Sequence, residues 1–248
     1  MKLTSVLVFI ALLVGGVSKC EAKKKIVELG DGTKVHAFEK FADDFSGGMD
    51  NWVVEQLEGG KVSLVDGKLD IDDFTGCSVW FKKKLSGAIM IEYDAVVVGE
   101  GGPNDRVSDL NCFWMASDPE CKDFFSKSKD RGGKFQNYHA LKLYYVGLGG
   151  HDNTKTRFRR YAGGGDRPCL PEHDLSDAKY LITANKVNHI RIIANEGQIQ
   201  YYRNGVLIYD FQDDDPYTSG YFGIRTYKNH MTVDNFVVYQ LKNAKKKK

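Results

Sequence analysis

The sequence has almost no helical periodicity, no internal repeat, no long linker and little net charge. The formal net charge is only +2, and part of it comes from basic runs at residues 23–25 and 245–248. The rest of the chain is neutral to acidic, which argues against duplex nucleic acid as a partner. No paired C-x-x-C spacing occurs among the cysteines, so a zinc site is not expected. The one long apolar run, residues 3–17, is shorter than the roughly 20 residues that a transmembrane helix needs.

The amino terminus instead has the pattern of an export signal. Lys2 precedes the apolar run, and Ser18 and Ala22 are small residues at which cleavage is expected. We therefore predict a signal peptide at residues 1–22 and a secreted or periplasmic protein. Cys20 allows an alternative, a lipoprotein anchored at the cell surface, although Lys19 stands where a small residue is usual. Membrane attachment is expected only in that case.

Four cysteines, Cys77, Cys112, Cys121 and Cys169, remain after the signal segment. Export would permit disulfides, and the sequence leaves all three pairings open.

Short alternating segments separated by turns fill the rest of the chain. Asp66-Gly67 and Asn204-Gly205 are two-residue hairpin turns, because both positions favour a positive φ. Glu196-Gly197 marks another turn between alternating segments. The pattern predicts an all-β fold, a two-sheet antiparallel β-sandwich of the concanavalin-like jelly-roll kind. We expect an N-terminal extension at residues 23–37, the sandwich at 38–241 and a basic tail at 242–248, in a monomer.

Several motifs carry a resemblance to known proteins. Arg-Asn-Gly at residues 203–205, Gly-Ile-Arg-Thr at 223–226 and Thr-Val-Asp-Asn-Phe at 232–236 resemble the concanavalin A-like lectin and glucanase superfamily. Gly-Gly-Pro-Asn-Asp-Arg-Val-Ser-Asp-Leu-Asn at 101–111, followed by Phe-Trp-Met-Ala-Ser-Asp-Pro at 113–119, resembles the uncharacterised YesU-like bacterial domains. The resemblance implies the sandwich fold and an association with the use of rhamnogalacturonan and pectin. It assigns no role to any single residue.

Long polar loops between residues 99 and 165 suggest where a ligand binds. On a strand, Arg157, Arg159 and Tyr161 would share one face, because side chains alternate. Arginine binds carboxylates with two parallel hydrogen bonds, and aromatic rings offer a flat surface to sugars. The expected partner is therefore an acidic polysaccharide or oligosaccharide. Alternatively, the arginines form structural ion pairs with Asp105, Asp109 or Asp118.

Our first functional hypothesis is a polysaccharide lyase that cleaves a uronic-acid glycan by β-elimination. This reaction needs a neutraliser of the carboxylate, a base and an acid. The candidate acid and base groups are His139, Tyr161 and Tyr144. The candidate substrate-binding residues are Arg157, Arg159, Arg225, Asn111, Asn153, Trp114 and His230.

Three alternatives use the same fold. A lectin-like binding protein would use Trp114, Tyr144 and Tyr161 as stacking surfaces. A glycoside hydrolase needs two carboxylates, and the nearest pattern, Glu92 and Asp94, has no third acid after it. A structural or adhesion domain would have a flat face without an aromatic-lined groove.

No cofactor is required for any of these functions. Asp44 and Asp234 lie in first and last strand segments, which often run side by side in sandwiches. Oxygen ligands there suit a structural Ca²⁺.

Overall fold

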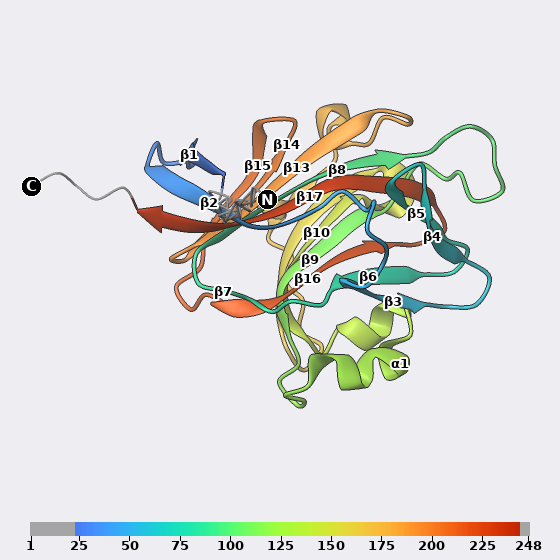
Figure 1. Cartoon of the computed structure of the whole chain (residues 1–248), viewed down its shortest axis with the longest axis horizontal. Helices are drawn as coiled ribbons and strands as arrows, with labels where there is room; N and C mark the ends of the chain where they lie inside the picture. The colour runs from blue at the N-terminus through green and yellow to red at the C-terminus, as the bar shows by residue number, and fades with distance from the viewer. Residues whose placement is uncertain (1–22, 244–248) are drawn as a thin grey trace, which may run out of the picture.

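The computed structural model describes residues 23–243. These residues form two antiparallel sheets packed face to face (Figure 1). The predicted signal segment at 1–22, with Cys20, and the basic run at 245–248 lie outside the described residues. None of the helices within residues 23–243 is long and apolar enough to cross a membrane.

The first sheet has nine strands, with β4 and β5 joined to it through β17. In spatial order it contains β1 (Lys24–Glu28), β2 (Lys34–Asp43), β17 (His230–Asn243), β8 (Ile89–Val97), β13 (Val187–Asn195), β14 (Gln198–Arg203) and β15 (Val206–Gln212), followed off this path by β5 (Lys68–Asp72) and β4 (Lys61–Val65).

The second sheet has eight strands, and β7 pairs only with β16. In spatial order it contains β12 (Asp174–Leu175), β11 (Lys155–Ala162), β10 (Lys142–Gly149), β9 (Leu110–Ser117), β16 (Ser219–Thr226), β6 (Cys77–Phe81) and β3 (Trp52–Gln56), with β7 (Leu85–Ser86) off this path. The short helices are η1 (Phe124–Lys127), α1 (Ser128–Arg131), η2 (Phe135–Tyr138), α2 (Gly150–Asn153), η3 (Pro171–His173) and η4 (Ala178–Tyr180).

The β-sandwich prediction is confirmed, and so are the hairpin turns. Asp66-Gly67 joins β4 to β5, Glu196-Gly197 joins β13 to β14, and Asn204-Gly205 joins β14 to β15. All six of these turn residues have a positive φ. This backbone twist matches that of the flanking strands, which is why these dipeptides favour two-residue hairpins.

The sandwich begins earlier than the predicted boundary at residue 38. Residues 24–28 and 34–38 pair as β1 and β2, and β2 pairs in turn with β17. Val27 and Val35 are buried in an apolar cluster on the outer face of the first sheet, which explains why this segment is part of the fold. At the other end, β17 continues to Asn243, beyond the predicted end at residue 241.

Two apolar layers stabilise the second sheet. The main core lies between the sheets and takes the inward side chains, such as Phe158 of β11. A second cluster lies on the outer face of this sheet, beneath the segment that contains η1, α1 and η2. That segment packs below β3 and β6 in Figure 1. It covers only part of the outer face and leaves the part nearest β11 open.

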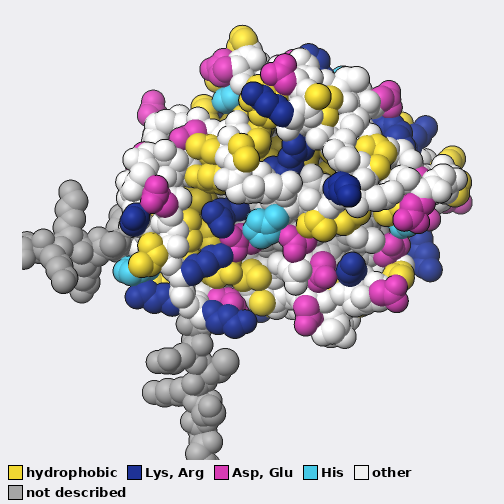
Figure 2. Space-filling view, turned by 90° about the horizontal axis from the view of Figure 1, so that it is seen from above, with side chains coloured by type: hydrophobic (Ala, Val, Ile, Leu, Met, Phe, Trp, Pro, Cys, Tyr) yellow, Lys and Arg dark blue, Asp and Glu magenta, His cyan; other side chains and the backbone are white. Residues whose placement is uncertain are grey.

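The outer face of the first sheet has a mixed charge. Seen from that side, Lys and Arg side chains are interspersed with Asp and Glu, and several cations gather at one corner (Figure 2). Glu92, for example, pairs with both Lys25 and Arg191. Lys25 and Arg191 on this face therefore share one acidic partner.

Candidate functional site

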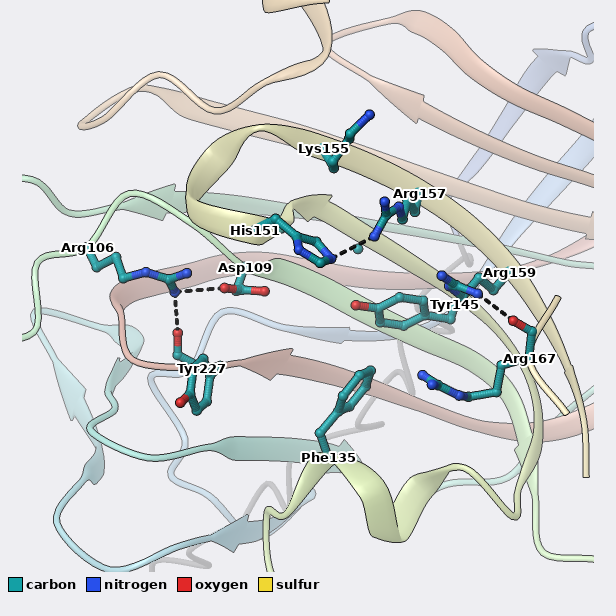
Figure 3. A pocket seen from close by; sticks show the side chains of 12 residues that line it. Arg106, Asp109, Phe135, Tyr145, His151, Lys155, Arg157, Arg159, Arg167 and Tyr227 are labelled. Atoms are coloured by element: carbon teal, nitrogen blue, oxygen red, sulfur yellow. Dashed lines mark hydrogen bonds and ion pairs between the residues drawn. The ribbon is translucent and has the colours of Figure 1, made fainter. Parts of the chain in front are cut away.

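A pocket of about 520 Å³ opens on the uncovered part of the outer face of the second sheet (Figure 3). Its volume lies within the range of ordinary small-molecule sites. The strand register explains its position. Arg157 of β11 pairs with Gly147 of β10, which pairs with Asn111 of β9, and Arg159 pairs with Tyr145 in the next row. The side chains of both rows point away from the sandwich core, because their sequence neighbours point into it.

Gly147 forms the floor of the pocket. A Cβ atom at this position would lie 2.5 Å from the hydroxyl of Tyr145, which leans across the glycine. Any other residue would displace this ring and fill the pocket. The hydroxyl of Tyr145 makes no hydrogen bond to another group of the described chain and points into the open space in Figure 3. Burial raises the pKa of Tyr145 well above its ordinary value, so the hydroxyl is protonated at neutral pH.

The charge of the pocket is strongly positive. Its lining includes five cationic side chains and a single carboxylate, that of Asp109; the cations are Arg106, Lys155, Arg157, Arg159 and Arg167. A cleft lined by one sign of charge concentrates ligands of the opposite sign. The pocket therefore suits an anionic ligand.

Three acidic side chains neutralise part of this charge. Arg106 donates to Asp109 at 2.8 Å and to Asp152 at 2.6 Å. The Nε and Nη2 atoms of Arg157 donate to the two carboxylate oxygens of Asp174, each at 3.0 Å. Hydrogen bonds from Arg157 hold the pKa of Asp174 below its usual value. Asp174 was not among the predicted partners of the arginines.

A strained turn holds His151 in the pocket. Gly149, His151, Asp152 and Asn153 all have a positive φ, which is costly for residues other than glycine. The amide of Asn153 offsets part of this cost, because it both donates to and accepts from the backbone of Ile182, at 2.8 Å each. Strain of this kind is frequent at functional sites.

A contact with Arg157 of β11 sets the hydrogen-bonding role of His151. Nη1 of Arg157 lies 2.6 Å from Nε2 of His151. Arginine has only donors, so Nε2 of His151 is the acceptor in this contact. The lone pair of His151 is therefore engaged by Arg157.

Aromatic rings form two sides of the pocket. Tyr227 follows β16, and its backbone carbonyl accepts a hydrogen bond from Arg106 at 2.9 Å. Phe135 belongs to η2, and its ring lies below Tyr145 in Figure 3. A buried ion pair between Glu55 of β3 and Arg131 of α1, 2.7 Å apart, attaches this helical segment to the sheet.

The structure brings some of the predicted residues to the pocket. Arg157 and Arg159 line it, and Lys155 joins them at the expected spacing of two residues. Tyr161 shares their face but is fully buried beside Tyr145. The predicted sharing of a face along this strand is confirmed.

Asn111, Arg225 and His139 lie beneath or beside the pocket, without lining it. Asn111 and Arg225 pair with each other in register and are 3% and 2% exposed. His139 is half-buried behind Phe135, 5.0 Å between ring centroids. Burial and the nearby charges of Arg167, Arg225 and Arg159 lower the pKa of His139. Contact of these three residues with a sugar would require the covering side chains to move.

The prediction that Trp114 and Tyr144 meet the ligand is wrong. Both are fully buried in the core between the sheets, on the opposite face of β9 and β10 from the pocket. The Tyr144 hydroxyl donates to Asp213 at 2.6 Å. Alternation defines two faces of a strand, and on β9 both faces are apolar, so the sequence did not reveal which one was inside.

His230 and Asn153 also have structural roles that differ from those predicted. The ring nitrogens of His230 contact Asp105 at 3.1 Å and Asp70 at 2.9 Å, which attaches the 99–109 loop to the first sheet. Asn153 uses its amide on Ile182, as described above, and does not line the pocket.

The calcium hypothesis for Asp44 and Asp234 stays a prediction. Asp44 accepts from the backbone and hydroxyl of Ser46, and Asp234 accepts from the backbone of Asn235. Over residues 23–243, no group of three or more His, Cys, Asp or Glu side chains is arranged to hold a metal ion. The four cysteines of this part of the chain are free thiols.

Sequence reasoning missed Tyr145, Phe135 and Arg167 as pocket residues. Tyr145 could have been found, because counting back along the hairpin of β10 and β11 from its turn places it opposite Arg159. Phe135 and Arg167 come from segments that fold back over the sheet, and no local pattern predicts their position.

The architecture places the protein among the galectin-like and concanavalin-like β-sandwiches. More particularly, the chain belongs to the family DUF6250, a domain of unknown function, whose model matches residues 71–236. No curated protein matches the chain.

Solved structures of the same fold share little sequence with this protein. A Bacillus subtilis protein of unknown function with a galectin-like fold has a TM-score of 0.65 and 17% identity, over 84% of this chain and 100% of that one. The carbohydrate-binding module CBM66 of Bacillus subtilis has a TM-score of 0.52 and 12% identity, over 77% and 96%. The β-glucanase of Bacillus licheniformis has a TM-score of 0.52 and 13% identity, over 81% and 97%. At these identities the similarity concerns the fold.

Proposed function

We propose that this protein binds an acidic glycan in the cationic pocket of its second sheet. One observation carries the proposal: the pocket lining holds five cations and one carboxylate around an open glycine floor. Phe135 and Tyr227 offer apolar ring surfaces beside these cations, and sugar rings stack on such surfaces. The fold shared with a carbohydrate-binding module and a β-glucanase supports a carbohydrate as the ligand.

Binding without cleavage is better supported than β-elimination. Elimination needs a free base, and none of the candidate groups in the pocket is one. Arg157 occupies the lone pair of His151, and Tyr145 has a raised pKa and holds its proton. Asp109 accepts hydrogen bonds from Arg106, Ser108 and Asn111.

Hydrolysis has less support. It requires two carboxylates on either side of the scissile bond, whereas Asp109 is the single acid among the lining residues. Glu92 and Asp94 belong to β8 of the other sheet and are engaged by Arg191 and His189.

A lyase is the second candidate, and one observation favours it. The protonated Tyr145 hydroxyl lies on the pocket floor with no partner among the described residues, where it could protonate a leaving oxygen. A bound glycan that displaced Arg157 from Nε2 of His151 would free the lone pair of this ring to act as the base. In this version Tyr145 and His151 replace His139, Tyr144 and Tyr161.

The proposal extends to where the protein acts and to its natural ligand. The export pattern of residues 1–22 supports action outside the cytoplasm, with lipid anchoring at Cys20 as the alternative. The resemblance to YesU-like domains supports a pectic glycan, such as rhamnogalacturonan, as the natural ligand of a monomeric protein.

Affinity electrophoresis and calorimetry with polygalacturonate, rhamnogalacturonan and a neutral β-glucan test the binding. We expect retardation by the acidic glycans alone and weaker binding at higher salt. Equal binding to the neutral glucan would contradict the proposal. Ultraviolet absorbance of unsaturated uronides, measured in parallel, tests the lyase. If this absorbance appears with the wild-type protein and is lost in Tyr145→Phe, the protein is a lyase.

A further inference from the structure

Two of the five pocket cations have no acidic partner in the part of the chain that the structure describes. Arg106, Arg157 and Lys155 each lie within 4 Å of a carboxylate. Within residues 23–243, neither Arg159 nor Arg167 forms an ion pair. Arg159 donates through Nη1 to the backbone carbonyl of Arg167. This contact leaves the edge of Arg159 formed by Nε and Nη2 without an acceptor among the described residues.

These two cations lie at one end of the pocket. Arg159 stands on β11 opposite Tyr145 of β10. Arg167 follows β11 and folds back, so that its guanidinium lies 5.7 Å from the ring centroids of both Phe135 and Tyr161. In Figure 3, the side chains of Arg159, Arg167, Tyr145 and Phe135 surround the same space.

A third arginine without an ion pair among the described residues, Arg225 of β16, packs against Phe135 as Arg167 does. Arg225 is 2% exposed, and its guanidinium lies 4.7 Å from the ring of Phe135. It donates to the hydroxyl of Ser78 and to the carbonyl of Gly133, two neutral acceptors. Charges taken out of water are costly unless paired. Arg159 and Arg167, which form no ion pair within residues 23–243, therefore form a preorganised site for an anion, and Arg225 adds positive charge nearby.

We propose that the space between Arg159 and Arg167 binds the carboxylate of a hexuronate unit. This inference rests on the proposed function and assigns the carboxylate to these two residues. Arg157, whose guanidinium is occupied by Asp174, is not the carboxylate-binding arginine.

The available donors suit a planar anion. The free edge of Arg159 offers two parallel N–H groups, which match the two oxygens of a carboxylate. The hydroxyl of Tyr145 can donate to the same group from the pocket floor. A sulfate ester shares this charge chemistry, so the test must separate the two ligands.

The test compares dissociation constants for polygalacturonate in the wild type, Arg159→Gln, Arg167→Gln and Arg191→Gln. Arg191 lies on the first sheet beside Glu92, so Arg191→Gln changes the net charge equally but far from the pocket. We expect each pocket variant to bind on the order of 10-fold more weakly or worse, as for a lost hydrogen bond to a charged group. Arg191→Gln should bind within about twofold of the wild type, because rim or remote charges act weakly in salt.

Two further arms refine the assignment. The double variant Arg157→Gln/Asp174→Asn removes an ion pair without changing the net charge, and we expect a smaller loss than for Arg159→Gln. Arg159→Lys keeps the positive charge but removes the two parallel N–H groups, and we expect an affinity between those of the wild type and Arg159→Gln. Dextran sulfate and carboxyl-reduced polygalacturonate are the ligand controls. Preference for dextran sulfate over polygalacturonate would overturn the carboxylate assignment.

The outcomes separate this inference from the proposed function. If the wild type binds polygalacturonate and the Arg159 and Arg167 variants bind it equally well, the subsite is wrong and the function stands. If the wild type binds no acidic glycan, the proposed function fails. Thermal unfolding with the galacturonate monomer then tests the anion site alone, and no stabilisation there would overturn the subsite as well.

Discussion

Replacement of Glu55 by glutamine tests how the helical segment beside the pocket is held in place. Glu55 is 2% exposed and accepts from four donor atoms on three residues. Arg131 contributes Nε and Nη2, Trp80 donates from Nε1 at 3.0 Å, and the Tyr138 hydroxyl donates at 2.7 Å. Burial and the negative charge of Glu55 raise the pKa of Tyr138, so this hydroxyl stays protonated.

Glu55→Gln keeps the shape of the side chain and removes its charge. Arg131, which is 3% exposed, then becomes a buried cation without a counterion. Breaking a buried pair in this way costs about 3–5 kcal/mol. We expect the free energy of unfolding, measured by urea denaturation, to fall by about 3 kcal/mol. This is a large share of the roughly 5–15 kcal/mol by which domains are stable.

The matched control is Lys127→Ala. Lys127 pairs with Asp130 at 3.3 Å on the same helical segment, but the two side chains are 52% and 69% exposed. Removal of this pair should cost less than about 1 kcal/mol. If Glu55→Gln lowered the free energy of unfolding no more than Lys127→Ala does, burial would not strengthen the contribution of the Glu55–Arg131 ion pair to stability.

Two further variants test the loops around the pocket. Asn153→Ala loses both hydrogen bonds to Ile182 and places alanine at a positive φ, so we expect about 2 kcal/mol less stability and faster amide exchange at Ile182. Asn153→Gly should lose less, because it removes only the hydrogen bonds, and equal losses would show that backbone strain is unimportant. Burial alone would lower the pKa of His230, but hydrogen bonds and charges from Asp70 and Asp105 raise it. The stability that protonated His230 adds to the fold is complete below its ordinary pKa of about 6.5 and disappears as the pH rises through the raised pKa of the folded state. His230→Asn should therefore lower the free energy of unfolding more at about pH 5.5 than at about pH 8.5. A loss of stability that does not depend on pH would contradict this reasoning.

The sequence predicted the shared face of Arg157 and Arg159 correctly, because a single strand decides this geometry. Arg157 and Arg159 are two residues apart, and strand alternation alone puts them on one face. The same rule could not say that Trp114 and Tyr144 point into the core, because the strands that carry them are apolar on both faces. A strand buried on both sides shows no polar alternation from which its orientation can be read.

The sequence by itself determined the sandwich, its hairpin turns and the outward face of β11, because these features follow from alternation and from dipeptides that favour a positive φ. Only the tertiary structure decided which arginines keep an unpaired charge. Asp174 reaches Arg157 from 17 residues away along the chain, and Phe135 and Arg167 reach the pocket on segments that fold back over the sheet. Pairing between charges depends on distances in space, and residues far apart in a sequence carry no local pattern that fixes those distances.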